Sequence, residues 1–132
     1  MKKIIFCFLL ILISSSLSTT LKADVIYLYQ YTHHHNCPGV LRDSGPLFIY
    51  EKTLNEEDGL MVGYWLNSFN RDTYSIGYHR YFIQEKDFGI GAKVGLVTGY
   101  DLPIFAALSF HYKFIDVNYN PTIVTTTFRF KF

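Results

Sequence analysis

The chain is poor in cysteine, in long apolar segments and in net charge of either sign. Its 132 residues include two cysteines, Cys7 and Cys37, and Cys7 falls in an apolar N-terminal run, so no internal disulfide is expected. The longest apolar run, residues 4–13, is ten residues long, which is too short to cross a bilayer comfortably. Twelve Lys plus Arg nearly balance eleven Asp plus Glu. The charge balance therefore gives no sign of a basic surface that would bind nucleic acid.

The first 23 residues have the pattern of a secretory signal. Lys2 and Lys3 precede the apolar run, and the polar stretch "SSSLSTTLKA" follows it and ends on Ala23. A charged start, a short apolar segment and a small final residue are typical of a cleaved signal peptide. We therefore expect residues 1–23 to be a secretory signal and residues 24–132 to be one mature domain. An uncleaved membrane anchor is the alternative.

Aromatic residues and period-two alternation dominate the remaining sequence. The chain holds 12 Phe, 11 Tyr and one Trp, and no segment has convincing helical periodicity. In "FGIGAKVGLVTG" (88–99) every second residue from Phe88 to Leu96 is apolar, and most residues between them are small or polar. The final "TTTFRFKF" alternates phenylalanines with Arg129 and Lys131. Such strands after an export signal predict a bacterial outer-membrane β-barrel whose apolar face meets lipid.

The alternation predicts an all-β fold, an eight-stranded antiparallel transmembrane up-and-down β-barrel. The expected strands are residues 24–34, 46–54, 59–69, 72–84, 87–99, 103–112, 114–120 and 122–132. An even number of antiparallel strands can close without leaving an edge in lipid. Barrels of this kind have short turns and both chain ends in the periplasm, and longer loops outside the cell.

This topology would gather polar residues at one extracellular rim. The outer loops are expected at residues 33–45, 67–72, 99–103 and 118–121, and the periplasmic turns at 55–58, 84–87 and around Lys113. The polar rim residues would be His33, His34, His35, Asn67, Ser68, Arg71, Asp72, Asp101 and Asn120.

Small residues mark the face of the strands that would point into the barrel. They are Gly59, Gly63, Gly77, Gly89, Gly91, Gly95, Gly99, Ala107 and Ser109. Eight strands enclose room only for side chains or one small ligand. Two interpretations stay open. The glycines leave a slot for a narrow molecule such as an acyl chain, or they relieve strain while Trp65, Tyr81, Phe105 and His111 fill the space.

Whether a residue points into or out of the barrel predicts the role of several others. His79 and His111 are expected to form hydrogen bonds inside the barrel. A polar set inside the barrel or at its ends would comprise Lys93, Arg80, Asp116 and Lys113. An interfacial girdle of aromatic residues would comprise Tyr27, Tyr74, Tyr78, Tyr112 and Tyr119.

Three segments resemble a known family. "GLMVGYWLNSFNRDTYSIGYH" (59–79) resembles the central hairpin of the PagP-type lipid A palmitoyltransferases, in which a Gly-Leu-aromatic strand runs into a rim Asp-Ser pair and returns through Gly-Tyr. "VGLVTGYDLPIFAALSFHYKFIDVNYNPTIVTTTFRFKF" (94–132) is similar to the C-terminal half of that family. "YLYQYTHH" (27–34) aligns with its first strand, which ends in an essential histidine. Short uncharacterised PagP-like barrels are also similar.

The resemblance implies transfer of an acyl group from a phospholipid to lipid A by a rim His, Asp and Ser. By position these are His34, Asn67 and Ser68. Asn67 replaces the acid, so it can form hydrogen bonds but carries no charge, and Asp72 or Asp101 could orient the histidine. An enzyme of this kind requires His34 and Ser68 to approach each other.

Two other interpretations of the histidines stay open. Adjacent side chains on a strand point to opposite faces, so the three neighbouring histidines cannot face one ion unless they lie in a loop. Two of them with Cys37 or Asp43 could bind zinc. Alternatively, the histidines only solvate the mouth of a non-enzymatic surface barrel with a structural or envelope-interaction role.

The expected partners follow from the predicted location in the bacterial outer membrane. They are phospholipid and lipid A, and the barrel assembly machinery acting through the C-terminal strand that ends in Phe132. No cofactor, metal or nucleic acid is expected, and we expect a monomer.

Overall fold

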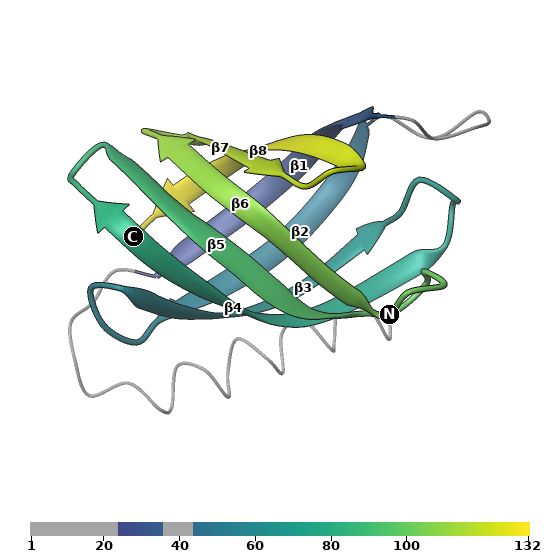
Figure 1. Cartoon of the computed structure of the whole chain (residues 1–132), viewed down its shortest axis with the longest axis horizontal. Coiled ribbons are helices and arrows are strands. Elements are labelled where there is room, and N and C mark those ends of the chain that lie inside the picture. The colour runs from purple at the N-terminus through teal and green to yellow at the C-terminus, as the bar shows by residue number, and fades with distance from the viewer. Residues whose placement is uncertain (1–23, 36–43) are drawn as a thin grey trace.

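The computed structural model describes residues 24–35 and 44–132, which form a closed antiparallel β-barrel of eight strands. The strands are β1 (Val25–His34), β2 (Ser44–Thr53), β3 (Asp58–Leu66), β4 (Asp72–Gln84), β5 (Phe88–Val97), β6 (Ile104–Tyr112), β7 (Ile115–Tyr119) and β8 (Ile123–Lys131). Each strand pairs with the next in sequence, and β8 closes on β1; Figure 1 shows the strands winding around the barrel in chain order. The predicted architecture is confirmed, and all eight strands are found with ends that differ by at most three residues.

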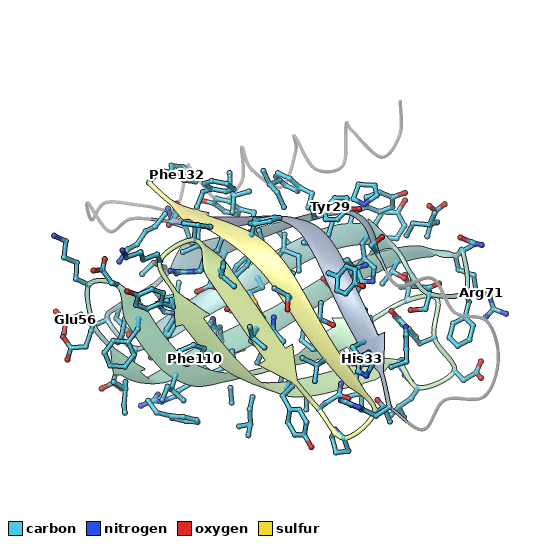
Figure 2. All side chains as sticks on the ribbon, turned by 90° about the horizontal axis from the view of Figure 1, so that it is seen from above. Tyr29, His33, Glu56, Arg71, Phe110 and Phe132 are labelled. Carbon is cyan, nitrogen blue, oxygen red and sulfur yellow. The ribbon has the colours of Figure 1, made fainter. Side chains whose placement is uncertain are left out.

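The barrel has two different ends. We call the end with His34, His35 and the loops at 67–71, 98–103 and 120–122 the rim, and the opposite end, with residues 54–57, 85–87 and 113–114, the turn end. Figure 2 shows Arg71 and His33 at one end and Glu56 at the other. At the turn end, backbone hydrogen bonds of 2.9 and 3.0 Å join Asp24 to Phe132. The expected signal segment lies outside the described residues, among which no helix is long and apolar enough to cross a membrane.

The two faces of the wall differ as the alternation predicts. On β5, Ile90, Val94 and Leu96 are exposed on the outside, whereas Gly91 and Lys93 are buried on the inside. The same pattern holds on β8, where Phe128 and Phe130 are exposed and Arg129 is buried. The exposed apolar side chains form a belt around the barrel, with Ile76, Leu96 and Leu108 each more than half exposed.

A bulge in β1 changes the phase of the strand. The pairing with β8 moves from Leu28 and Phe128 directly to Gln30 and Thr127, so Tyr29 is an extra residue without a partner in the ladder. Tyr29 has a φ of 55°, the left-handed conformation in which bulges often place one residue. Unbroken alternation from Val25 and Tyr27 would turn the odd-numbered residues inward along the whole strand. After the bulge, Thr32 is buried and His33 is exposed, so the even-numbered residues face inward.

The interior glycines face large neighbouring side chains and leave no slot beside them. A Cβ added at Gly77 or Gly95 would lie within 2.9 Å of the Phe105 ring, and one at Gly89 would lie 2.4 Å from the His111 ring. Equivalent neighbours are Glu51 for Gly59, Ile49 for Gly63 and His79 for Gly91. The acyl-chain slot suggested by the glycines is therefore wrong; they give room to bulky side chains. Gly99 lies beyond the end of β5 and has a φ of 80°, so it belongs to a turn and not to the inner face of a strand.

The pairing between neighbouring strands is interrupted at two places near the rim. β6 residues 104–107 pair with β5 but have no ladder partner on β7, whose pairing with β6 begins at Leu108 and Tyr119. Likewise, β2 residues 44–46 have no partner on β3, because that ladder begins at Leu47 and Trp65. Pro46 lies in the second opening and has no N–H to donate.

Candidate functional site

His34 and Ser68 meet at the rim. Ser68 Oγ lies 3.1 Å from His34 Nε2, and both side chains are partly buried. The expected approach of the two side chains is therefore observed. For His34 to act as a base, Nε2 must be unprotonated, and the serine hydroxyl then donates to it.

The bulge in β1 explains why His34, and not a neighbouring histidine, faces Ser68. His33 is exposed on the outer face, and its ring contacts that of His35 edge-on at 5.1 Å between centroids. His34 lies opposite Ile123 of β8, two residues beyond the pair of Thr32 and Thr125. The three adjacent histidines therefore do not converge on one point.

The loop that carries Ser68 is a tight turn between β3 and β4. Asn67 N donates to Arg71 O at 2.9 Å, and Asn70 N donates to Asn67 O at 2.9 Å. Asn70 has a φ of 57°, a conformation that asparagine tolerates better than most residues. Ser68 is thus held in a short closed loop at the end of β3.

Asn67 is almost completely buried and serves as the cap of this loop. Its Oδ1 accepts hydrogen bonds from Phe69 N at 2.9 Å and Arg71 N at 3.0 Å, and its Nδ2 donates to Gly99 O at 2.8 Å. Its exposed fraction is 1%. The carboxamide is thus used by three backbone groups, and Asn67 is not the group that orients His34.

Aromatic residues surround this part of the rim. Trp65 Nε1 donates to the Tyr100 hydroxyl at 3.3 Å, and the Phe69 and Tyr100 rings meet edge-on with centroids 6.3 Å apart. Burial raises the pKa of the Tyr100 hydroxyl above its usual value. Tyr100 therefore stays neutral at physiological pH and can accept the indole N–H.

Several of the remaining polar rim residues have contacts of their own within the described part of the chain. Asp72 accepts a hydrogen bond from the Tyr64 hydroxyl at 2.7 Å, and Arg71 lies 6.0 Å from the centre of the Phe69 ring. Asp101 is exposed in the loop between β5 and β6. Asn120 caps the loop before β8, where its Oδ1 accepts from Thr122 and Ile123.

The zinc interpretation involves histidines within the described residues and two candidate ligands outside them. No three His, Cys, Asp or Glu side chains converge on a common point within residues 24–35 and 44–132. Cys37 and Asp43, the other two candidate ligands, lie outside the described residues.

A second polar centre lies inside the barrel nearer the turn end; the sequence predicted its His79 but missed its carboxylate, Glu51. Glu51 is fully buried and accepts hydrogen bonds from Tyr27 at 2.6 Å and Tyr81 at 2.8 Å, and it pairs with His79 Nδ1 at 3.0 Å. Tyr27 therefore lies inside the barrel, and its assignment to the outer girdle is wrong; the β1 bulge comes after Tyr27, so the residue keeps the inward phase of Val25. Tyr74, Tyr78, Tyr112 and Tyr119 lie on the outward phase of their strands.

Lys93 and Asp116 extend the interior network, as their phase predicts. Lys93 Nζ pairs with Asp116 Oδ2 at 2.7 Å and lies 4.3 Å from the centre of the Tyr27 ring. Arg129 is also buried. Arg80, in contrast, pairs with Glu57 and Asp58 on the outside of the turn end, and Lys113 is exposed there. Arg129 could have been found from the sequence, because it alternates with Phe128 and Phe130, whereas the apolar run 47–50 before Glu51 gives no such signal.

The interior also contains a serine–histidine–carboxylate chain. His79 Nε2 lies 2.7 Å from Ser109 Oγ, and His79 Nδ1 faces Glu51. Catalytic triads have the same order of groups. However, the exposed fractions of His79 and Glu51 are 0% and that of Ser109 is 4%, so no substrate can reach the hydroxyl. We assign this chain to the packing of the lumen and the rim pair to the candidate site.

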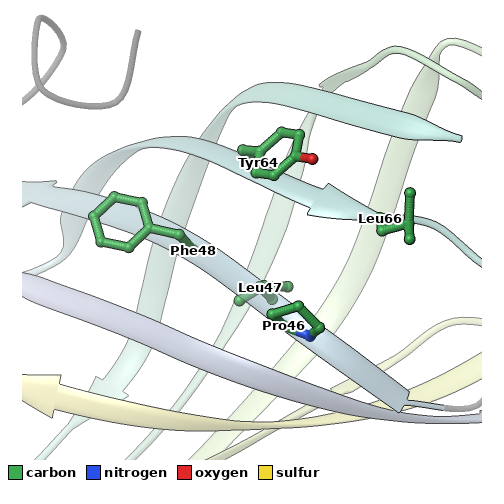
Figure 3. A pocket seen from close by; sticks show the side chains of 5 residues that line it. All are labelled: Pro46, Leu47, Phe48, Tyr64 and Leu66. Atoms are coloured by element: carbon green, nitrogen blue, oxygen red, sulfur yellow. The ribbon is translucent and has the colours of Figure 1, made fainter. Parts of the chain in front are cut away.

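An apolar groove lies on the wall at the opening between β2 and β3. It has a volume of about 240 Å³ and is lined by Pro46, Leu47, Phe48, Tyr64 and Leu66 (Figure 3). Leu66 is two residues before Ser68 in sequence. The groove therefore approaches the rim from the outer surface of the barrel.

Comparison with known proteins adds no family assignment. No family model matches the chain, and no curated protein matches it significantly.

Proposed function

We propose that the protein is a small bacterial outer-membrane β-barrel that transfers an acyl group between lipids at its rim, with Ser68 as the nucleophile and His34 as its base. The observation that carries the proposal is the 3.1 Å contact between Ser68 Oγ and His34 Nε2. A base within hydrogen-bond reach of a hydroxyl is the minimum arrangement for activating a serine. The PagP-like sequence pattern supplies the substrate class, a phospholipid donor and lipid A as acceptor.

The chemistry proceeds in two balanced steps. Ser68 Oγ attacks the ester carbonyl of the phospholipid while His34 takes the hydroxyl proton; the ester C–O bond breaks, and the lysophospholipid leaves with that proton. A hydroxyl of lipid A then attacks the acyl-serine and gives its proton to His34, which returns a proton to Ser68 as the new ester is released. No metal or redox partner is needed for either step.

The barrel wall supports access from the membrane. The ladder openings at β6 residues 104–107 and β2 residues 44–46 both lie in the rim half. The outer surface there is apolar, as the groove of Pro46 and Phe48 shows. A reaction between two membrane lipids needs routes from the bilayer to the rim, and interrupted ladders are where a closed wall can admit a chain without losing hydrogen bonds.

Substitution of the two rim residues tests the proposal. We expect Ser68→Ala and His34→Asn each to lower acyl transfer at least 100-fold, because nucleophile or base is removed. Lipid A mass spectra from cells producing each variant, and transfer assays on barrels refolded in phospholipid vesicles, measure the effect. His33→Asn is the matched control, since the exposed His33 faces away from the site. Full activity of Ser68→Ala would show that the serine is not the nucleophile.

A non-enzymatic surface barrel is the second candidate. It is favoured by Asn67, which stands where the resembling enzymes have an acid, and by the packed interior, which offers no acyl-chain slot beside the glycines. In that case the lipid A mass would be the same in cells with and without the wild-type protein, although the protein is present in the membrane of the former.

A further inference from the structure

Asn67 connects two loops of the rim through both ends of its carboxamide. Its Oδ1 must be the acceptor for Phe69 N and Arg71 N, because backbone N–H groups only donate. Its Nδ2 must be the donor to Gly99 O, because a carbonyl only accepts. These contacts fix the orientation of the amide without ambiguity. They join the loop that carries Ser68 to the loop between β5 and β6.

The backbone conformation of Gly99 and its lack of a Cβ allow this contact. Its φ of 80° is strained for any residue with a side chain, and an added Cβ would lie 2.9 Å from Asp72 O and 3.0 Å from Asn67 Nδ2. The two loops therefore approach so closely that only glycine fits, and the carbonyl of Gly99 is directed to Asn67. Ser68 is the next residue after this anchor, so its position depends on the anchor.

We propose that Asn67 is a positioning residue, whose neutral carboxamide holds Ser68 against His34 by joining these two loops. This inference rests on the proposed function and deepens it. An aspartate at this position would keep both acceptor contacts but lose the donor to Gly99 O. It would also place a carboxylate oxygen about 3 Å from a carbonyl oxygen. Asn67 therefore does not stand in for a catalytic acid; its amide joins two loops of the rim.

Replacement by aspartate tests the requirement for an amide. We expect Asn67→Asp to lower kcat roughly tenfold or more, with KM within about twofold, because loss of one buried hydrogen bond displaces the nucleophile and not the lipid. The two enzymes are compared at neutral pH, where a carboxylate at position 67 is ionised and cannot donate to Gly99 O.

Asn120 provides a control with the same change of charge. Every hydrogen bond that the structure gives the Asn120 side chain ends on Oδ1, from Thr122 N, Thr122 Oγ1 and Ile123 N. Asn120→Asp keeps all of these acceptor contacts and should leave kcat unchanged. Gly99→Ala disturbs the Asn67 contact from the other side and should reproduce the fall in kcat. An Asn67→Asp variant as active as wild type, or more active, would overturn the proposal and indicate that an acid is tolerated or needed.

A readout without catalysis separates this inference from the proposed function. In detergent micelles, the His34 ring resonances should shift when Ser68 is replaced by Ala, since the hydroxyl contact is lost. Asn67→Asp should shift them in the same direction, and Asn120→Asp should not. If the wild-type protein is inactive, acyl transfer is refuted. The positioning role of Asn67 is then tested by the resonances alone, and unchanged His34 resonances in Asn67→Asp would refute it.

Discussion

Glu51 lies inside the barrel, nearer the turn end, and is the carboxylate around which the interior polar network forms. Three donors converge on it, from Tyr27, Tyr81 and His79, and Lys93 lies over the Tyr27 ring. A buried carboxylate is tolerated only when such donors and nearby cations compensate its lost hydration. The interior is therefore a connected polar network, and removal of one member leaves several partners unsatisfied.

Replacement of this carboxylate should cost much stability. Glutamine at position 51 offers one acceptor oxygen and an NH₂ group that donates toward groups that also donate, so Glu51→Gln should lower the free energy of unfolding by about 3–5 kcal/mol. Urea unfolding in lipid vesicles, followed by Trp65 fluorescence, measures the change. Glu57→Gln is the control, because the Glu57 pair with Arg80 is at the surface, where ion pairs contribute little. Equal effects of the two changes would contradict a network organised on Glu51.

The interior charges show what alternation can predict and what it cannot. The inward phase places Lys93 and Asp116 inside the barrel from sequence alone, and the structure agrees. Their pairing could not be predicted, because it depends on the stagger between strands that are separate in sequence. The same applies to His79 and Ser109, which come from β4 and β6.

Strand β1 determines which histidine faces the site, and its bulge is the deciding feature. Tyr29 looks like an ordinary strand residue, since tyrosine favours strands, and nothing in "YLYQYTHH" marks the extra residue. Plain alternation would have pointed His33 inward. The choice of His34 came from the family resemblance, and the bulge explains why this histidine is the one near Ser68.

The left-handed conformation at the bulge makes a test of this strand possible. Tyr29→Ile should lower the free energy of unfolding by roughly 1–2 kcal/mol, because a β-branched residue is strained at a φ of 55°. Tyr29→Gly should be tolerated at the same position. Tyr31→Ile is the matched control, since Tyr31 is an exposed tyrosine of the same strand that pairs regularly with Thr126. Urea unfolding of the three variants compares them, and equal stability of the two isoleucine variants would argue against the bulge.

The barrel as a whole combines a polar, packed interior with an apolar exterior. That arrangement is the reverse of a soluble β-barrel, in which apolar residues fill the interior, and it is typical of barrels in membranes. The period-two pattern predicted this fold because most strands repeat it, so errors at single residues do not change the result. Loop contacts such as Asn67 with Gly99 could not be predicted, since no periodicity governs them.

The apolar exterior leads to a test of membrane placement by depth. Ile76 is 59% exposed and pairs with Val62, the middle residue of β3, whereas Phe82, 63% exposed, lies near the turn end of β4. In a bilayer, Ile76→Arg should lower the free energy of unfolding by about 2–4 kcal/mol and Phe82→Arg by about 0–1 kcal/mol, since the cost of a charge falls toward the interface. Urea unfolding in phospholipid vesicles measures both. A water-exposed exterior would make both changes nearly neutral, because arginine would then be fully hydrated at either depth, and the outer-membrane location would have to be abandoned.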